Sequence, residues 1–144
     1  RNPFQLSGGE KRKVALAGII VMQPKILILD EPMAGLDPIG KNELKKLIMR
    51  LHNEVSPTIV IVSHDMDDIA EIASRVLVLS KGEIVIDKPV REAFSDEKLI
   101  KGLHLDLPNA RKIANKLISR GINIKNDVLT MKELEEEILR YAGV

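Results

Sequence analysis

Three small residues near the start of the chain form a turn that is suited to meet an anion. Ser7 is followed by Gly8 and Gly9, and an apolar helical pattern begins directly after them. A helix opening here would present free backbone N–H groups and the positive end of its dipole to a phosphate. The glycines would let the ligand come close, because they carry no Cβ. Taken alone, Ser-Gly-Gly favours a plainer interpretation, a glycine-rich helix cap.

Two adjacent carboxylates follow an apolar run at residues 26–29. In nucleoside triphosphatases a carboxylate at such a strand end holds Mg²⁺, often through water, and the next one can deprotonate an attacking water. Asp30 could serve Mg²⁺ in this way, and Glu31 could act as a general base. His64 ends a second apolar run and could reach a γ-phosphate from the same edge of a parallel sheet. The alternative is a solvated strand end, which His64 makes less attractive.

A second glycine-rich segment nearly matches a phosphate-binding loop. Residues 35–42, Gly-Leu-Asp-Pro-Ile-Gly-Lys-Asn, follow a predicted strand, open a predicted helix and approach the pattern G-x-x-x-x-G-K-[ST]. Asn42 replaces the hydroxyl that should bind Mg²⁺, Asp37 would place a negative charge in the cradle, and Pro38 lacks an N–H donor. We therefore expect an ordinary helix start here, and nothing before Leu6 supplies a phosphate loop.

Alternating helix and strand patterns are expected to position these side chains. Apolar periodicity, caps and turn residues predict an α/β architecture with a parallel sheet up to about residue 95. The predicted helices span residues 7–22, 38–54 and 66–73, and the predicted strands span 26–29, 58–62, 76–79 and 83–86. The first two helices each carry an apolar stripe, formed by Val14, Leu16, Ala17, Ile20 and Val21 in the first and by Leu44, Leu47, Ile48 and Leu51 in the second. The runs at 26–29 and 58–62 are typical of strands buried on both faces of a parallel sheet. Lys81-Gly82 predicts a hairpin between the last two strands.

The sequence changes character after residue 95. Helical patterns at 109–120 and 131–142 are joined through Gly121 and Asn126-Asp127. We therefore predict two domains, an α/β part at residues 1–95 and a small, mainly helical appendage at 96–144. Apolar stripes at 110–118 and 131–139 either pack within the appendage or contact another subunit. The acidic run 135–137 is expected to face solvent.

The composition restricts the classes of function. The chain has 144 residues, of which 44% are hydrophobic and 30% charged, and a formal net charge of +1. This balance gives no general electrostatic reason to bind nucleic acid or an anionic membrane. An aromatic content of 2% argues against a base-stacking surface, and the absence of cysteine excludes disulfides and thiolate metal sites. No apolar stretch is long enough to span a membrane, so a membrane role would require a partner.

Taken together, the motifs resemble the ATPase domain of ABC transporters. Leu6-Ser7-Gly8-Gly9-Glu10 is similar to the family signature LSGGQ, and residues 26–32 (ILILDEP) are similar to its Walker B strand with the catalytic glutamate. Residues 34–37 (AGLD) resemble the D-loop, and residues 63–65 (SHD) resemble the switch-histidine segment. Glu10 stands where glutamine is usual, and Met33 where threonine or serine is common. Longer stretches, including the tail, look most like the energy-coupling factor ATPases, the group that includes cobalt and vitamin importers.

The resemblance implies nucleotide sites shared between two subunits. Two such ATPase subunits would sandwich two ATP molecules with Mg²⁺, and each site would take its phosphate loop from one subunit and its signature turn from the other. The roles implied for this chain are Asp30 for Mg²⁺, Glu31 as general base, His64 at the γ-phosphate, Asp37 in contact with the opposite subunit, and Ser7, Gly8 and Gly9 on the ATP of the partner.

The resemblance also implies partners at a membrane. ATP hydrolysis would drive a transmembrane coupling subunit and a substrate-capture subunit, which would keep the ATPase at the cytoplasmic face of the cell membrane. The imported substrate would be a cobalt or nickel ion or a vitamin, bound by another subunit. The tail would help two ATPases to dimerise, and no nucleic acid is expected as a partner.

We expect these residues to be the C-terminal part of a longer chain, because the family's phosphate loop, glutamine loop and adenine-stacking aromatic all precede the signature. Alone, the chain is expected neither to bind ATP tightly nor to hydrolyse it. The strands at 26–29 and 59–62 are expected to expose apolar patches. Two alternatives are the ATPase domain of a soluble ABC protein of DNA repair or translation, and a non-enzymatic dimerisation or regulatory module.

Overall fold

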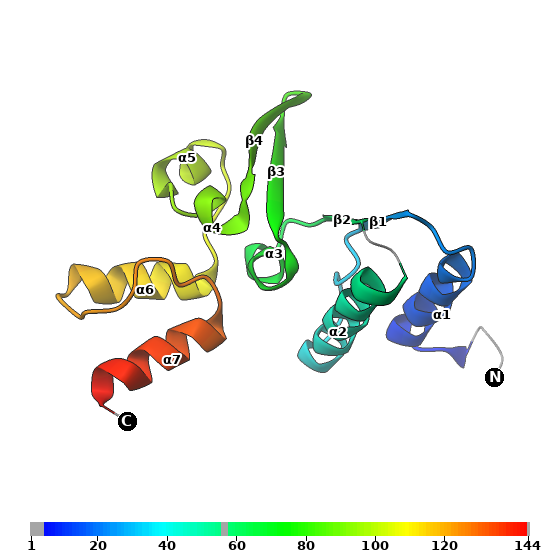
Figure 1. The fold of residues 1–144 in the computed structure, drawn as a ribbon, viewed down its shortest axis with the longest axis horizontal. Coiled ribbons are helices and arrows are strands. Elements are labelled where there is room, and N and C mark those ends of the chain that lie inside the picture. Colours follow the sequence, from blue (N-terminus) through cyan, green and yellow to red (C-terminus); the bar gives the residue numbers. More distant parts are fainter. Residues whose placement is uncertain (1–4, 56–57, 144) are drawn as a thin grey trace. The chain divides into compact units, whose positions relative to one another are not determined.

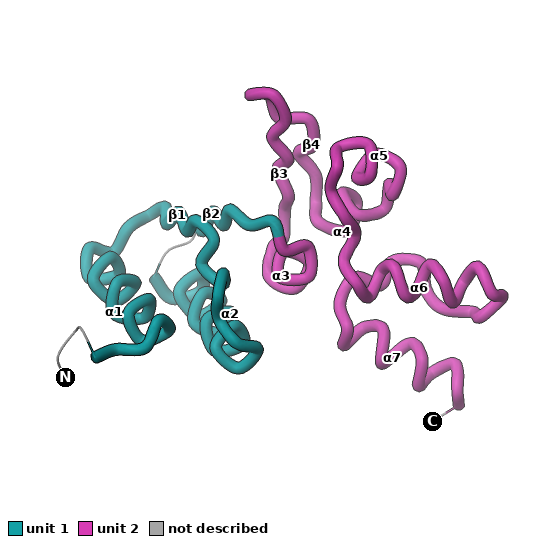
Figure 2. The backbone as a smooth tube through the Cα atoms, turned by 180° about the vertical axis from the view of Figure 1, so that it is seen from behind, with its two compact units in different colours: residues 1–64 teal, residues 65–144 magenta. Residues whose placement is uncertain are grey.

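The structure, a computed structural model, describes residues 5–55 and 58–143 (Figure 1). The chain divides into two compact units, residues 1–64 and 65–144, which are coloured separately in Figure 2. The first unit contains α1 (Gly8–Ile20), β1 (Ile26–Asp30), α2 (Pro38–Glu54) and β2 (Thr58–Val62). The second contains α3 (Met66–Ile72), β3 (Arg75–Ser80), β4 (Glu83–Pro89), α4 (Val90–Ala93), α5 (Glu97–Gly102), α6 (Asn109–Ser119) and α7 (Met131–Ala142). The predicted α/β class is confirmed.

The first unit is built on a parallel strand pair. β1 and β2 pair in register from Ile26 opposite Thr58 to Asp30 opposite Val62, and α2 connects them. Both helices, α1 and α2, lie on the same side of the strands (Figures 1 and 2). The buried apolar side chains of this unit are Leu16, Leu27, Leu29, Met33, Leu44, Ile48 and Leu51.

The opposite face of this strand pair is open. Ile26 and Ile28 of β1 are 60% and 66% exposed, and Val60 and Val62 of β2 are 43% and 50% exposed. The prediction of burial on both faces is therefore wrong for this chain, because helices cover only one side of the pair. The expected apolar patch on these strands is confirmed.

Helix α1 buries only part of the predicted apolar stripe. The predicted stripe includes Val14 and Val21, but these side chains are 60% and 83% exposed. Leu16 is buried and Ile20 is half-buried, four residues apart on one face of the helix. The predicted stripe combined residues from opposite faces, since Val14 and Leu16 are only two positions apart. The helix also ends at Ile20, two residues earlier than predicted.

The second unit begins with a short helix and an antiparallel hairpin. β3 and β4 pair through a turn at Lys81 and Gly82, whose φ angles are 53° and 85°. This confirms the predicted hairpin. A core cluster then joins β4 to the segments that follow it, and its buried members are Ile86, Ala93, Phe94, Ile100, Leu107 and Leu129. Helices α4 and α5 were not predicted, and both are too short to show a clear helical period. The domain boundary at residue 95 stays a prediction.

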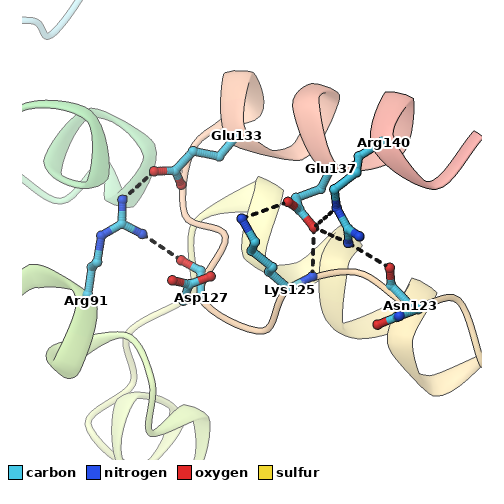
Figure 3. Close-up of polar contacts among 7 residues, drawn as sticks. All are labelled: Arg91, Asn123, Lys125, Asp127, Glu133, Glu137 and Arg140. Carbon is cyan, nitrogen blue, oxygen red and sulfur yellow. Dashed lines mark hydrogen bonds and ion pairs between the residues drawn. The ribbon is translucent and has the colours of Figure 1, made fainter. Parts of the chain in front are cut away.

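Helices α6 and α7 form a helical hairpin with a core of its own. The buried residues of this core are Ala110, Ala114, Ile124, Val128 and Leu134. Arg91 of α4 donates to the carbonyl oxygen of Asp127 at 2.8 Å and forms an ion pair with Glu133 (Figure 3). Glu133 also accepts the Leu129 N–H at 2.8 Å, so one carboxylate fixes the start of α7.

The expectation that the acidic run 135–137 faces solvent is wrong for Glu137. Glu135 and Glu136 are exposed, but Glu137 is only 6% exposed. It lies three residues after the buried Leu134, on the covered face of α7, and accepts hydrogen bonds from Arg140 Nη2 at 2.7 Å and from the Lys125 N–H at 3.1 Å (Figure 3). These donors, Arg140 above all, lower the pKa of Glu137 to about 2.

Within residues 5–55 and 58–143, no helix combines the length and the apolar character that a membrane span requires.

Candidate functional site

The ends of β1 and β2 bring Glu31 and His64 together. Glu31 extends the strand pairing, because its N–H donates to the carbonyl oxygen of Val62 at 2.9 Å. Glu31 Oε1 then lies 2.5 Å from His64 Nδ1 and accepts the His64 backbone N–H at 3.2 Å. Parallel pairing places Glu31 and His64 at the same edge of the sheet, where the sequence predicts them, and the direct contact between their side chains is an additional finding.

The pair remains accessible to a ligand. The side chain of His64 is 85% exposed and that of Glu31 is 35% exposed. Glu31 has a positive φ of 44°, which is unusual for a residue with a side chain. Such backbone persists only where the surroundings hold it, and it occurs frequently at functional sites. A carboxylate aimed at an exposed strand end and hydrogen-bonded to an imidazole can accept a proton from water.

Asp30 could supply one carboxylate ligand to a magnesium ion whose other ligands are phosphate oxygens and water. It is the last residue of β1 and is exposed on the open face of the strand pair. Among the residues that the structure describes, no group of three acidic or histidine side chains could form a complete metal site. Mg²⁺ is often held by one or two carboxylates together with phosphates and water, so a single Asp30 carboxylate is compatible with it.

The Ser7–Gly9 turn has the geometry of a helix N-terminus open to solvent. The Ser7 hydroxyl accepts the Glu10 N–H at 3.2 Å, and Glu10 Oε2 accepts the Ser7 N–H at 2.9 Å. This reciprocal cap is a second role for Ser7, and it explains how glutamate serves in place of glutamine. The Ser7 N–H lowers the pKa of Glu10. A Cβ at Gly8 would meet no atom within 4 Å, so the turn is open on that side.

Asp37 is the N-cap of α2. Its Oδ1 accepts the Gly40 N–H at 2.7 Å, and Pro38 occupies the first helical position. An N–H that a phosphate loop would offer to a ligand is thus already bound to Asp37. The structure agrees with the rejection of residues 35–42 as a phosphate loop.

One residue of this region was missed in the sequence. Arg12 of α1 donates from Nη1 to the carbonyl oxygen of Pro32 at 3.0 Å, next to Glu31. Arg12 lies three residues after Gly9 and four before Leu16, so all three occupy one helix face. That spacing was the signal available in the sequence.

Comparison with known proteins places these motifs in a family. The family model described as ABC transporter matches residues 1–34. The energy-coupling factor transporter ATP-binding protein EcfA2 of Caldanaerobacter subterraneus is 46% identical over 98% of this chain and 49% of its own length. The protein of the same name from Clostridium perfringens is 44% identical over 96% of the chain and 49% of its own length.

A solved structure agrees with these relatives. The structure of cbiO1 from Clostridium perfringens, described as part of the ABC transporter complex cbiONQ, is 36% identical with a TM-score of 0.62. The match covers 83% of this chain and 43% of that one. The chain thus spans about half the length of the curated relatives it matches. Motifs, fold and relatives agree: over nearly its whole length, the chain is similar to ATP-binding proteins of the ABC transporter family, in particular to those of the energy-coupling factor group.

Proposed function

We propose that the protein containing this chain is the ATP-hydrolysing subunit of an energy-coupling factor importer. The observation that carries this proposal is the contact between Glu31 and His64 at the end of a parallel strand pair that also presents Asp30. These three residues supply a base, a hydrogen-bonding imidazole and a metal-binding carboxylate at one edge. The relatives of this chain bear the name of such ATP-binding proteins.

Each residue has a distinct task in this proposal. Glu31 orients and deprotonates the attacking water, and His64 holds Glu31 and contacts the γ-phosphate. Asp30 binds Mg²⁺, directly or through water, and the ion would neutralise charge on the phosphates. Asp37 contacts the opposite subunit.

The Ser7–Gly9 turn serves the ATP that a second subunit holds. Its glycines open a helix N-terminus to solvent, and helix N-termini attract phosphate. A homodimer or heterodimer of ATPases would therefore contain two composite sites. Transmembrane and substrate-capture subunits would complete an importer of a cobalt or nickel ion or a vitamin, with the ATPases at the cytoplasmic face of the membrane.

The test uses the full-length gene product and a matched pair of variants. Glu31→Gln removes the base, and Glu43→Gln neutralises a carboxylate of α2 that pairs with Lys13 on the surface of the same unit. We expect E31Q to lower ATP turnover by about 10²-fold or more, with ATP binding retained, since general base catalysis contributes about 10²–10⁴-fold. E43Q should hydrolyse ATP at the wild-type rate. An E31Q protein as active as E43Q would refute the role of Glu31.

A second measurement concerns the 144 residues alone. Calorimetric titration with ATP and Mg²⁺ should show neither micromolar binding nor turnover, because residues 35–42 form a helix cap and the sequence contains no other phosphate-loop pattern. Micromolar affinity would contradict this expectation and would require a phosphate site that the motifs do not indicate.

The tail suits a second role as a contact between ATPase subunits. Ile113 and Ile118 of α6 are 39% and 37% exposed, and Ile138 and Leu139 of α7 are 42% and 44% exposed. Apolar side chains of this size on a helical hairpin favour contact with another surface. Sedimentation of the full-length protein with Ile138→Asp would test this role. If the variant dimerises with unchanged affinity, the role in subunit contact is refuted, and these residues only pack within the tail.

A further inference from the structure

Helix α1 contacts the segment that follows Glu31 at one point and approaches it closely at a second. Arg12 Nη1 donates to the carbonyl oxygen of Pro32 at 3.0 Å, in a partly buried contact. One turn earlier, a Cβ on Gly9 would lie 3.7 Å from Leu36 Cδ2, which is ordinary van der Waals contact. The face of α1 that begins at the signature turn thus lies against residues 32–36.

This segment has an irregular backbone that its surroundings must hold. Glu31 and Gly35 have φ angles of 44° and 70°. Internal support comes from two weak turn hydrogen bonds, Ala34 N–H to the Glu31 carbonyl at 3.2 Å and Leu36 N–H to the Met33 carbonyl at 3.3 Å. Outside support comes from the burial of Met33, which is 4% exposed, and from the guanidinium of Arg12.

The Arg12 contact acts on the residue that adjoins the proposed base. A hydrogen bond from a charged donor is stronger than one between neutral groups, and the planar guanidinium has a defined direction. The Pro32 carbonyl belongs to the peptide group directly after Pro32, so it responds to any rotation of the backbone at Glu31 and Pro32. Fixing this carbonyl therefore restricts the direction in which the Glu31 side chain leaves the backbone.

We propose that Arg12 is a positioning residue that holds Glu31 in place and connects it to the Ser7–Gly9 turn. The inference rests on the proposed function, in which that turn meets the nucleotide of a second subunit. Because Arg12 and the turn belong to one rigid helix, a shift of α1 on contact with that nucleotide would move the Pro32 carbonyl. The second subunit's nucleotide would thus influence the base of this subunit's own site.

The chain offers a matched control beside Arg12. Lys13 is the next residue of α1 and forms an ion pair with Glu43 of α2 at 2.5 Å. The Lys13 and Glu43 side chains are 48% and 55% exposed, so this pair contributes little to stability. Lys13→Gln removes one positive charge from the same helix but leaves the Arg12 contact intact.

The experiment measures steady-state ATP hydrolysis by the full-length gene product, as wild type and as R12Q, R12M, R12K and K13Q. We expect R12Q and R12M to lower kcat by about 10- to 100-fold, because small misplacements of a catalytic group are costly, while KM for ATP changes much less. R12K, which keeps a charged donor, should recover a large part of kcat. K13Q should match the wild type in both constants.

The possible outcomes separate this inference from the function on which it rests. A wild-type protein without ATPase activity would overturn the proposed function. An active wild type with R12Q and R12M at the wild-type kcat would overturn the positioning role alone. If R12Q does not fold, the kcat of R12M becomes the deciding measurement, because the unbranched apolar methionine side chain can still pack along α1. Loss of folding in both, or a rise in KM with kcat unchanged, would also overturn the positioning role.

Discussion

Replacing Leu134 by alanine should destabilise the helical hairpin of α6 and α7 by about 3–4 kcal/mol. Leu134 is 3% exposed and packs in a cluster with Ala110, Ala114, Ile124 and Val128. The substitution removes three buried carbon atoms and leaves a cavity. Two of the neighbours are alanines that are fully buried in α6, and an alanine has no rotamer with which to fill the space. We therefore place the cost in the middle of the range of about 2.7–5 kcal/mol known for buried leucines.

Leu139→Ala is the matched control for this prediction. Leu139 lies on the same helix and loses the same three carbon atoms, but it is 44% exposed. Helix propensity changes equally in the two variants, so their difference isolates burial. We expect L139A to cost less than about 1 kcal/mol, in line with partial burial of its side chain.

Urea denaturation of the 144-residue chain provides the assay. Tyr141 is the chain's one tyrosine, and no tryptophan is present, so tyrosine fluorescence reports on α7. Circular dichroism follows the helices in parallel, and the protein is kept at a concentration at which sedimentation shows a monomer. Equal destabilisation by L134A and L139A in the monomer would refute the assignment of Leu134 to the core and Leu139 to the surface.

Two further predictions concern a buried carboxylate and a helix cap. The pKa of Glu137 is lowered from 4.5 to about 2, so its carboxylate stabilises the fold above about pH 4.5, and this contribution is lost as the pH falls toward 2. Glu137→Gln should remove this acid-dependent part, and urea midpoints measured from pH 2 to 6 that fall equally for both proteins would contradict it. Gly40→Ala should weaken the α2 cap by about 1 kcal/mol, because its Cβ would lie 2.9 Å from Asp37 Oδ1. An unchanged or raised thermal midpoint would contradict this prediction.

The sequence predicts elements well where local signals and burial agree. Helix α2 begins and ends as predicted, because Asp37 and Pro38 set its start and its apolar face is the one that the fold covers. The hairpin follows from Lys81-Gly82, which adopts the positive φ angles that the turn needs. Helix α1 shows where this approach fails. It is apolar around much of its circumference, so periodicity does not choose a face, and the tertiary contacts of Leu16 do.

Charged side chains show a second limit of sequence reasoning. Glu137 occurs in a run of three glutamates, and such a run usually lies on a solvated face. Its burial depends on Arg140 and on the Lys125 backbone, which only the path of the 120–130 connection brings close. Arg91 illustrates the same point, since its acceptor is the carbonyl oxygen of Asp127, 36 residues away.

The candidate site follows from topology more than from its motifs. Parallel strands end at the same edge, so two apolar runs followed by Glu31 and His64 were enough to predict that both residues lie at one edge, whereas the contact between their side chains is seen only in the structure. The Arg12 contact could not be predicted in this way, because its acceptor is a backbone carbonyl and any residue at position 32 would supply one. When a side chain binds a backbone atom, the sequence contains no particular residue type that would reveal its partner.

This distinction bears on how composite nucleotide sites communicate. The signature turn and the base would act on different ATP molecules, so a direct contact between them is not needed for chemistry. They are nevertheless joined within one unit by a single helix face that runs from Gly9 to Arg12, binds the Pro32 carbonyl and lies close to Leu36. In a site that works alone, this link would only hold Glu31 in place. In a dimer it would also let the base of one site sense the occupancy of the other, as alternating or concerted hydrolysis requires.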